Sequence, residues 1–158
     1  MILNKNKSLD VAYIDFSRAF DSVVHSKLLV KLKSYGFQYD ILTWIKAFLS
    51  NRIQCVVLED QFSIYSHVKS GIAQGSAIGP LLFILYINDI VDLFERNVEC
   101  KMFADDVKLY SSINTNLDEN PLQTALESLV RWSCDWQLAI NASKSTILHL
   151  GKKTSFKL

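Results

Sequence analysis

Short strand-like runs and amphipathic helical segments alternate along this chain in an order that restricts its fold. Runs rich in β-branched and aromatic residues indicate strands, and apolar residues spaced three and four apart indicate helices. The predicted strands cover residues 9–16, 54–58, 62–68, 99–103, 107–111 and 146–150, and the predicted helices cover 27–35, 40–49, 81–94 and 121–140. Neighbouring hairpins give antiparallel pairs, so we expect an α+β fold, an antiparallel sheet with helices packed on one face.

The composition fits one folded domain over residues 1–158 and excludes several classes of protein. The chain is 49% hydrophobic and 21% charged, unlike a disordered or low-complexity protein. Its longest apolar run, Leu81–Ile87, is far shorter than the roughly 20 residues of a membrane span, so we expect no membrane partner. The N-terminus shows no secretory signal, and the three scattered cysteines fit reduced thiols inside a cell.

The net charge of +1 identifies no partner, but the charges are unevenly distributed. Basic residues outnumber acidic ones in 26–58 and 121–158, whereas acidic residues prevail in 59–120. A basic surface around Lys27–Lys46 and the tail at Lys152–Lys157 would suit a phosphate backbone. Solvated faces of ordinary helices would give the same pattern.

Carboxylates occur where two predicted elements end. Asp15 leaves the first strand, and Asp105 and Asp106 occupy the tip of the second long hairpin. An antiparallel sheet can bring a strand end close to a neighbouring hairpin tip, and three carboxylates there would favour Mg²⁺ or Mn²⁺. Taken singly, each feature also fits ordinary chemistry, because Asp is common in turns and at strand ends.

Four segments with these acids follow one another in a recognisable order. They read YIDFSRAFD (13–21), SGIAQGSAIGPLLF (70–83), FADD (103–106) and NASKS (141–145). They resemble motifs A, B, C and D of the reverse transcriptases of non-LTR (LINE-type) retrotransposons. The resemblance covers about residues 9–151.

The resemblance implies roles in catalysis for the acids and for one lysine. Asp15 and Asp105 would bind two Mg²⁺ ions (Mn²⁺ is the alternative), with Asp106 as the third acid and the Phe16 carbonyl as a backbone ligand. Two such ions activate a 3′-hydroxyl and stabilise the leaving pyrophosphate. Lys144 matches the lysine that helps to protonate the pyrophosphate, although an exposed lysine is usually only solvated.

Other matched positions imply contacts with the substrate. Phe20 corresponds to the steric gate, whose ring would clash with a ribose 2′-hydroxyl; a core aromatic is the simpler reading. Gln74, Gly75 and Ser76 correspond to the loop that contacts the nucleotide and the template. Glycine in such a loop lets the backbone approach a base or sugar closely.

The resemblance therefore implies an RNA-directed DNA polymerase that uses an RNA template, a DNA primer and deoxynucleoside triphosphates, in the cytoplasm or nucleus. Its fold would be the palm of a right-hand polymerase with parts of the fingers and no thumb. No counterpart of the upstream fingers or of the thumb is visible, so we expect a fragment with little activity alone. Ala73 also replaces the proline that commonly precedes the motif B glutamine.

Three alternatives to this function stay open. A group II intron-type maturase is disfavoured by Gln74-Gly75-Ser76 and by the Leu-Leu-Phe that follows Pro80. An RNA-directed RNA polymerase is disfavoured by Phe20, since it needs room for the ribose hydroxyl. A non-catalytic nucleic-acid-binding relic is disfavoured by the presence of all three acids. The sequence does not identify the element, the template RNA, the host or the oligomeric state.

Overall fold

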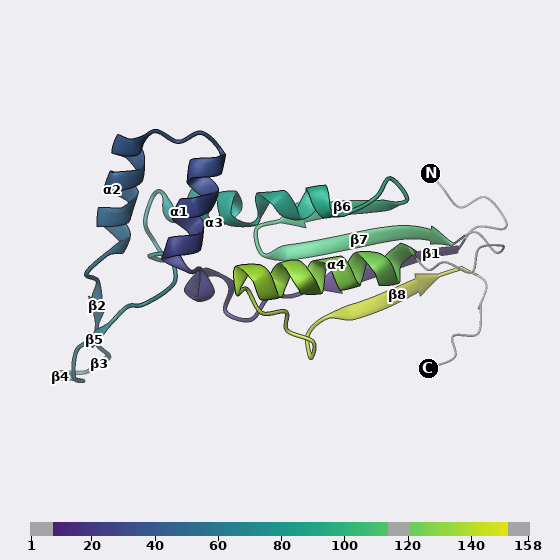
Figure 1. Ribbon diagram of the computed structural model, residues 1–158. Coiled ribbons are helices and arrows are strands. Elements are labelled where there is room, and N and C mark those ends of the chain that lie inside the picture. Colours follow the sequence, from purple (N-terminus) through teal and green to yellow (C-terminus); the bar gives the residue numbers. More distant parts are fainter. Residues whose placement is uncertain (1–7, 114–120, 152–158) are drawn as a thin grey trace. The chain divides into compact units, whose positions relative to one another are not determined.

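The computed structural model describes residues 8–113 and 121–151 of the chain (Figure 1). The chain divides into two compact units, one made of residues 1–17 and 89–158 and the other of residues 18–88. Each unit is described by itself below. That residues 1–158 act as a single domain stays a prediction.

The first unit is built on a four-stranded antiparallel sheet in the order β6-β7-β1-β8. Its strands are β1 (Ser8–Ile14), β6 (Val98–Phe103), β7 (Asp106–Ile113) and β8 (Thr146–Leu150). All four were predicted, and β8 has the predicted limits. Because β1 pairs with both β7 and β8, the segment that follows it leaves from the middle of the sheet.

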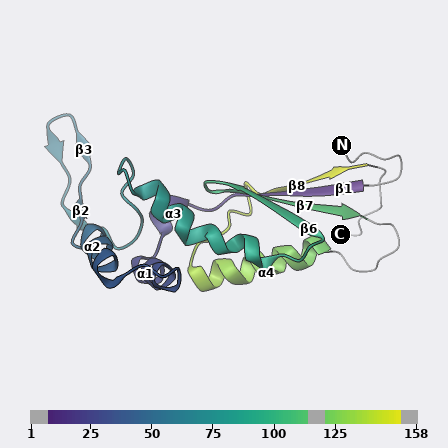
Figure 2. The same ribbon diagram turned by 90° about the horizontal axis from the view of Figure 1, so that it is seen from above.

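One face of this sheet is covered by α4 (Pro121–Trp136), as Figure 2 shows from above. Alternate side chains of a strand point to opposite faces, and those of Ala12 and Leu109, which are paired in register, are fully buried. The α4 residue Leu129 is also fully buried, and Trp132 of α4 packs against Phe16 with ring centroids 6.2 Å apart. The helical face is therefore the core of this unit, and Tyr13 and Lys108 lie on the open face.

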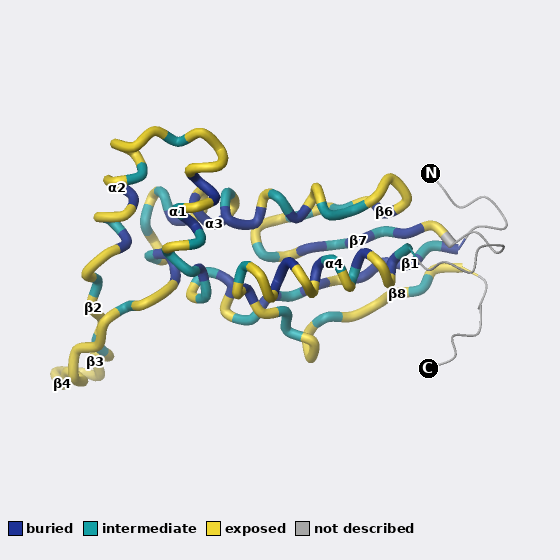
Figure 3. Tube along the Cα trace, in the orientation of Figure 1, coloured by how far each residue is buried: buried dark blue, intermediate teal, exposed yellow. Residues whose placement is uncertain are grey.

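The second unit combines three helices with an exposed hairpin. The helices are α1 (His25–Ser34), α2 (Tyr39–Leu49) and α3 (Gly79–Ile87), and the hairpin contains β2 (Ile53–Gln54), β3 (Val57–Leu58), β4 (Gln61–Phe62) and β5 (Ser66–His67). Strand β3 pairs with β4 across Glu59-Asp60, where the sequence predicts the turn. The hairpin is exposed along its length (Figure 3).

Several predicted boundaries are wrong. The helix predicted over 81–94 changes after Ile87 to a 3₁₀ helix, η2 (Asn88–Leu93). The last helix ends at Trp136 and not near Ile140, because Gln137 has a left-handed φ of 56°. Asp40 lies in the first turn of α2, whereas Gln38 is its N-cap.

Two helices of the second unit leave large apolar side chains exposed. Leu81 of α3 is 55% exposed and Trp44 of α2 is 57% exposed, so neither helix buries its whole apolar surface within the structure described. Among residues 8–113 and 121–151, no helix is both long enough and apolar enough to cross a membrane.

Candidate active site

The backbone brings the three predicted acids to one end of the sheet in the first unit (Figure 1). The last pair between β1 and β7 is Ile14 with Val107, so the next position of this register places Asp15 beside Asp106. Phe103 pairs with Asp106, and Asp105 lies in the turn between them. Asp15 follows Tyr13 by two residues, which puts both on the open face of the sheet.

These three carboxylates make no hydrogen bond or ion pair with any residue that the structure describes. Asp15 and Asp105 are partly exposed and Asp106 is exposed. However, no three His, Cys, Asp or Glu side chains within 8–113 and 121–151 are arranged to hold a metal ion together. The predicted three-acid cluster is therefore not formed. The backbone places the three acids at one end of the sheet, but their side chains do not converge on one point.

The hairpin turn explains part of this arrangement. Ala104, the first turn residue, has a φ of 49°, and tight hairpins require positive φ at such a position. Left-handed backbone costs a residue with a Cβ about 1–2 kcal/mol. The turn can thus be tight without glycine, and it leaves Asp105 at the tip and Asp106 as the first residue of β7.

The donor chemistry still fits a divalent cation. Carboxylate and carbonyl oxygens are the ligands that Mg²⁺ and Mn²⁺ prefer. The Phe16 carbonyl accepts no hydrogen bond from the residues described. In the bridge between Phe16 and Ile140, the hydrogen bonds join the neighbouring residues instead: the Ser17 amide donates to Ala139, and the Asn141 amide donates to Asp15. Asp15, Asp106 and this carbonyl could hold such an ion after side-chain rotation.

Lys144 lies in the turn that precedes β8. The Lys144 amide donates to the Asn141 carbonyl at 3.1 Å, and Lys144 is exposed. The same turn contacts the backbone of Asp15, since the Asn141 amide donates to the Asp15 carbonyl at 2.8 Å. The structure thus joins the predicted motif D segment to the residue that leaves β1.

In the second unit, Phe20 lies on the 3₁₀ helix η1 (Ala19–Ser22) and lines a cavity of about 240 Å³. Its ring stacks on Phe83 of α3, with centroids 4.2 Å apart and an interplanar angle of 21°. The cavity is lined by Phe20, Ala73, Gln74, Gly75, Gly79 and Pro80. The structure therefore brings the predicted gate residue together with the glycine-rich loop.

The loop residues have defined places. The Gln74 side chain is exposed and its amide donates to a carboxylate oxygen of Asp21 at 2.9 Å. Gly75 has a φ of 80°, which favours glycine at this turn. The Ser76 hydroxyl donates to the Ala73 carbonyl at 2.6 Å and accepts from the Gly79 amide at 3.1 Å, so it stabilises the loop.

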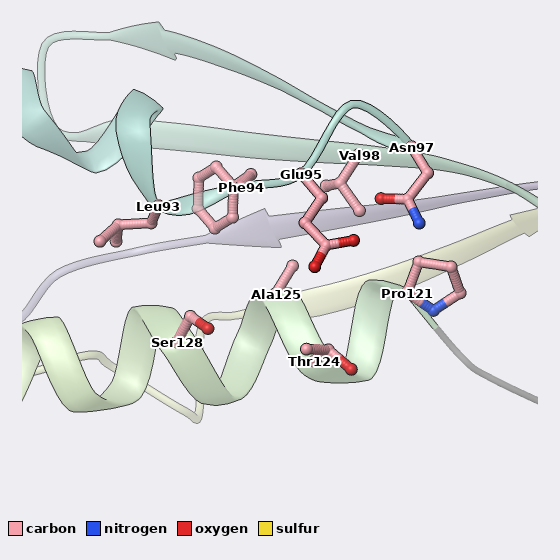
Figure 4. A pocket seen from close by; sticks show the side chains of 9 residues that line it. All are labelled: Leu93, Phe94, Glu95, Asn97, Val98, Pro121, Thr124, Ala125 and Ser128. Atoms are coloured by element: carbon pink, nitrogen blue, oxygen red, sulfur yellow. The ribbon is translucent and has the colours of Figure 1, made fainter.

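A larger cavity of about 390 Å³ lies in the first unit, beside the start of α4 (Figure 4). None of the predicted site residues lines it. Its lining residues are Leu93, Phe94, Glu95, Asn97, Val98, Pro121, Thr124, Ala125 and Ser128.

Some residues near the acids were not singled out by the sequence analysis. Ser145 accepts a hydrogen bond from the Asp15 amide at 3.2 Å, which only the three-dimensional structure could indicate. The Lys108 ammonium lies 5.2 Å from the centroid of the Tyr13 ring, and Lys101 pairs in register with Lys108. Lys108 follows Asp106 by two residues on β7, a same-face spacing that the sequence already shows.

The predicted basic surface is smaller than expected. Lys31 is 3% exposed, and its ammonium donates to the Tyr86 carbonyl and lies over the Tyr86 ring. Lys33 and Lys46 are exposed. The tail at 152–158 lies outside the residues described.

The family model for reverse transcriptase (RNA-dependent DNA polymerase) matches residues 2–158, and the chain belongs to this family. The chain is 28% identical, over 95% of its length, to the RNA-directed DNA polymerase from mobile element jockey of Drosophila melanogaster. It is 31% identical, over 86% of its length, to the probable RNA-directed DNA polymerase from transposon BS of the same species.

These matches cover 17% and 16% of the two relatives, so the chain spans about a sixth of their length. Among solved structures, apo telomerase from Candida tropicalis, truncated from its C-terminal domain, superimposes with a TM-score of 0.71 at 14% identity. That match covers 94% of this chain and 32% of the telomerase chain. It confirms a polymerase-type mixture of helices and antiparallel sheet.

Proposed function

We propose that this chain carries the palm and parts of the fingers of an RNA-directed DNA polymerase of a non-LTR retrotransposon. In this proposal the sheet with α4 is the palm, and the helices and hairpin of residues 18–88 belong to the fingers. The reaction adds a deoxynucleotide to the 3′-hydroxyl of a DNA primer paired with an RNA template, inside the cell, in the cytoplasm or nucleus. Residues 1–158 are expected to have little activity alone.

One observation carries this proposal. In a chain of the reverse transcriptase family, Asp15, Asp105 and Asp106 lie at one end of one sheet and lack partners among the residues described. Carboxylates at one end of a sheet repel one another when their side chains turn inward, unless cations neutralise them. Acids that cap strand ends or turns would be hydrogen-bonded to the backbone. Acids without such partners at one end of the sheet are instead what metal binding by a polymerase requires.

The residues would divide the work as follows. Two bound Mg²⁺ ions would lower the pKa of the primer hydroxyl and neutralise the pyrophosphate. Asp15, Asp105, Asp106 and the Phe16 carbonyl would hold these ions, and Mn²⁺ could replace them. Lys144 would give a proton to the pyrophosphate.

The glycine-rich loop and Phe20 would select the nucleotide. Phe20 lines its cavity with the ring held by Phe83, so a sugar in this cavity would meet a fixed edge. A 2′-hydroxyl would clash with that edge, which favours deoxynucleotides. Gln74, Gly75 and Ser76 would shape the loop against the base and the template.

The experiment that tests this function separates catalysis from binding. Asp105→Asn, made in the polymerase restored to its full length, keeps the size of the side chain and removes one charge. We expect single-nucleotide extension, with enzyme in excess over primer–template, to fall on the order of a thousand-fold, because electrostatic stabilisation supplies most of the rate enhancement. Binding of primer–template, measured by fluorescence anisotropy without nucleotide, should change little, since it depends on basic residues.

Asp92→Asn is the matched control, because Asp92 is an exposed acid of η2 in the same unit. It should extend like the parent. Extension by Asp105→Asn at the parental rate would refute the catalytic assignment. A parent that binds primer–template but never extends it would instead identify a non-catalytic binding relic.

A further inference from the structure

Asp15 lies just beyond the hydrogen-bonded ladder of the sheet, so something else must fix its backbone. The pairing of β1 with β8 ends at Tyr13 and Thr146, and its pairing with β7 ends at Ile14. The Asp15 amide instead donates to the Ser145 hydroxyl at 3.2 Å, and the Asp15 carbonyl accepts from the Asn141 amide at 2.8 Å. Both backbone polar groups of Asp15 are thus held by the segment 141–145.

Ser145 connects two parts of this arrangement. Its hydroxyl donates to the Asn141 carbonyl at 2.9 Å while accepting from Asp15, which one proton and two lone pairs allow. The amides of Lys144 and Ser145 also donate to the Asn141 carbonyl, at 3.1 and 3.0 Å. The turn that carries Lys144 and the backbone of Asp15 therefore form one hydrogen-bonded network.

Backbone groups also join these segments. The Ser17 amide donates to the Ala139 carbonyl at 2.8 Å, and Phe16 forms a bridge with Ile140. The bond to the Asp15 amide uses a side-chain acceptor, whereas the bonds donated by the amides of Ser17 and Asn141 join backbone groups alone. Removing the Ser145 hydroxyl would therefore free the Asp15 amide and leave the backbone bonds in place.

We propose that Ser145 is a positioning residue for Asp15, and that it makes Asp15 and the turn of Lys144 move together. This inference rests on the proposed function, since it assigns a purpose to the position of Asp15. Rotation about the Asp15 backbone changes the direction of its carboxylate. A misplacement of about 1 Å in a reacting arrangement can cost roughly a hundred-fold in rate, so a fixed amide is useful there.

The test uses three variants of the 158-residue chain and amide hydrogen exchange followed by NMR. In Ser145→Ala we expect the Asp15 amide to exchange about five-fold faster, the size expected for one hydrogen bond. Ser145→Thr keeps a hydroxyl and should restore the parental rate. Ser143→Ala is the control, because the Ser143 hydroxyl lies in the same turn and donates to the Asn141 side chain at 2.7 Å, away from the Asp15 amide.

The second readout is paramagnetic broadening of the Asp15 and Asp106 signals by Mn²⁺ alone. We expect Ser145→Ala to need about ten-fold more Mn²⁺ than the parent for equal broadening, because loss of a contact that orients a metal ligand typically costs about ten- to a hundred-fold in metal affinity. Ser145→Thr and Ser143→Ala should match the parent.

The two readouts distinguish the possible failures. Parental exchange at Asp15 in Ser145→Ala, or no restoration by threonine, would overturn the role of Ser145. Faster exchange with an unchanged Mn²⁺ response would show that the contact with Ser145 does not position the Asp15 carboxylate. This result would also overturn the role of Ser145. Absence of Mn²⁺ broadening in every protein would instead contradict the proposed metal binding, while exchange would still report on the contact.

Discussion

Two phenylalanines that follow β1 illustrate how a single residue acquires its role. The Phe16 side chain is buried against Trp132, so only its carbonyl is available to a ligand. Phe20 is partly exposed and lines a cavity while stacked on Phe83. The sequence placed both in one motif, and burial separates a core residue from a candidate gate.

Phe20→Val tests the gate. Loss of the ring should reduce discrimination against ribonucleotides by about ten- to a hundred-fold, because a steric clash worth a few kcal/mol is removed. The measurement is single-nucleotide incorporation with matched deoxy- and ribonucleotides by the polymerase restored to its full length. Phe62→Val, on the exposed hairpin strand β4, is the control. Unchanged discrimination in Phe20→Val would leave the ring with a packing role only.

Cys100 on β6 gives a prediction about pH. Burial raises the pKa of its thiol to about 11, although the neighbouring Lys101 acts in the opposite direction. Only the thiolate reacts with iodoacetamide, so alkylation of Cys100 should rise about ten-fold per pH unit from pH 8 to 10 without levelling off. Peptide mass spectrometry would follow it beside the exposed Cys134. A plateau near pH 9 for Cys100 would contradict this prediction.

At the scale of elements, the sequence predicted those helices and strands that the spacing of apolar residues and the turn residues determine. The four strands of the sheet, the hairpin turns and the exit of Asp15 from β1 were predicted correctly, because alternation and turn residues are local signals. The strands predicted over 54–58 and 62–68 were only partly correct, since each is replaced by two separate two-residue strands. The end of α4 was missed, since Gln137 adopts a left-handed backbone and the next residues pair with the segment after β1. The contact of Ser145 with Asp15 joins residues 130 apart in sequence, and no local pattern indicates it.

Gly71 shows how one backbone position holds an element. Its amide donates to the Val23 carbonyl, and the next amide, of Ile72, donates to the Phe20 carbonyl. A Cβ on Gly71 would lie 2.7 Å from the Asp21 Cα. This close approach is possible only for glycine, and it fixes the loop beside η1.

Gly71→Ala and Gly36→Ala form a matched pair, because both glycines have a positive φ, 84° and 86°. At Gly36 nothing lies within 4 Å of the added Cβ, so only backbone strain of about 1 kcal/mol is expected. Gly71→Ala must also move the backbone of Asp21, and we expect a loss of about 3 kcal/mol or more. Urea unfolding gives both values. Equal losses would show that the contact with Asp21 yields easily.

At the scale of the whole molecule, charge is the property that a nucleic acid would meet first. Lys31 is buried, so the basic surface depends on other lysines. On the open face of the sheet, Lys101 and Lys108 face each other across β6 and β7, and like charges in such pairs are destabilising. Lys101 is neutralised by Glu99 at 2.7 Å, whereas Lys108 lacks an ion pair among the residues described. A phosphate of the primer strand would compensate Lys108.

Lys108→Ala tests this contact through the salt dependence of binding. Each phosphate neutralised by a lysine contributes about 0.7–0.9 to the slope of the logarithm of affinity against the logarithm of salt concentration. We expect the variant to bind primer–template more weakly and with a slope smaller by about that amount, whatever the sequence of the nucleic acid. Anisotropy titrations at several salt concentrations would measure both. Arg131→Ala is the control. Arg131 is exposed on α4, the helix that covers the other face of the sheet, so this variant should keep the parental slope. Equal slopes for Lys108→Ala and the parent would place the nucleic acid away from the open face, because a lysine that contacts a phosphate cannot be removed without releasing its share of the counterions.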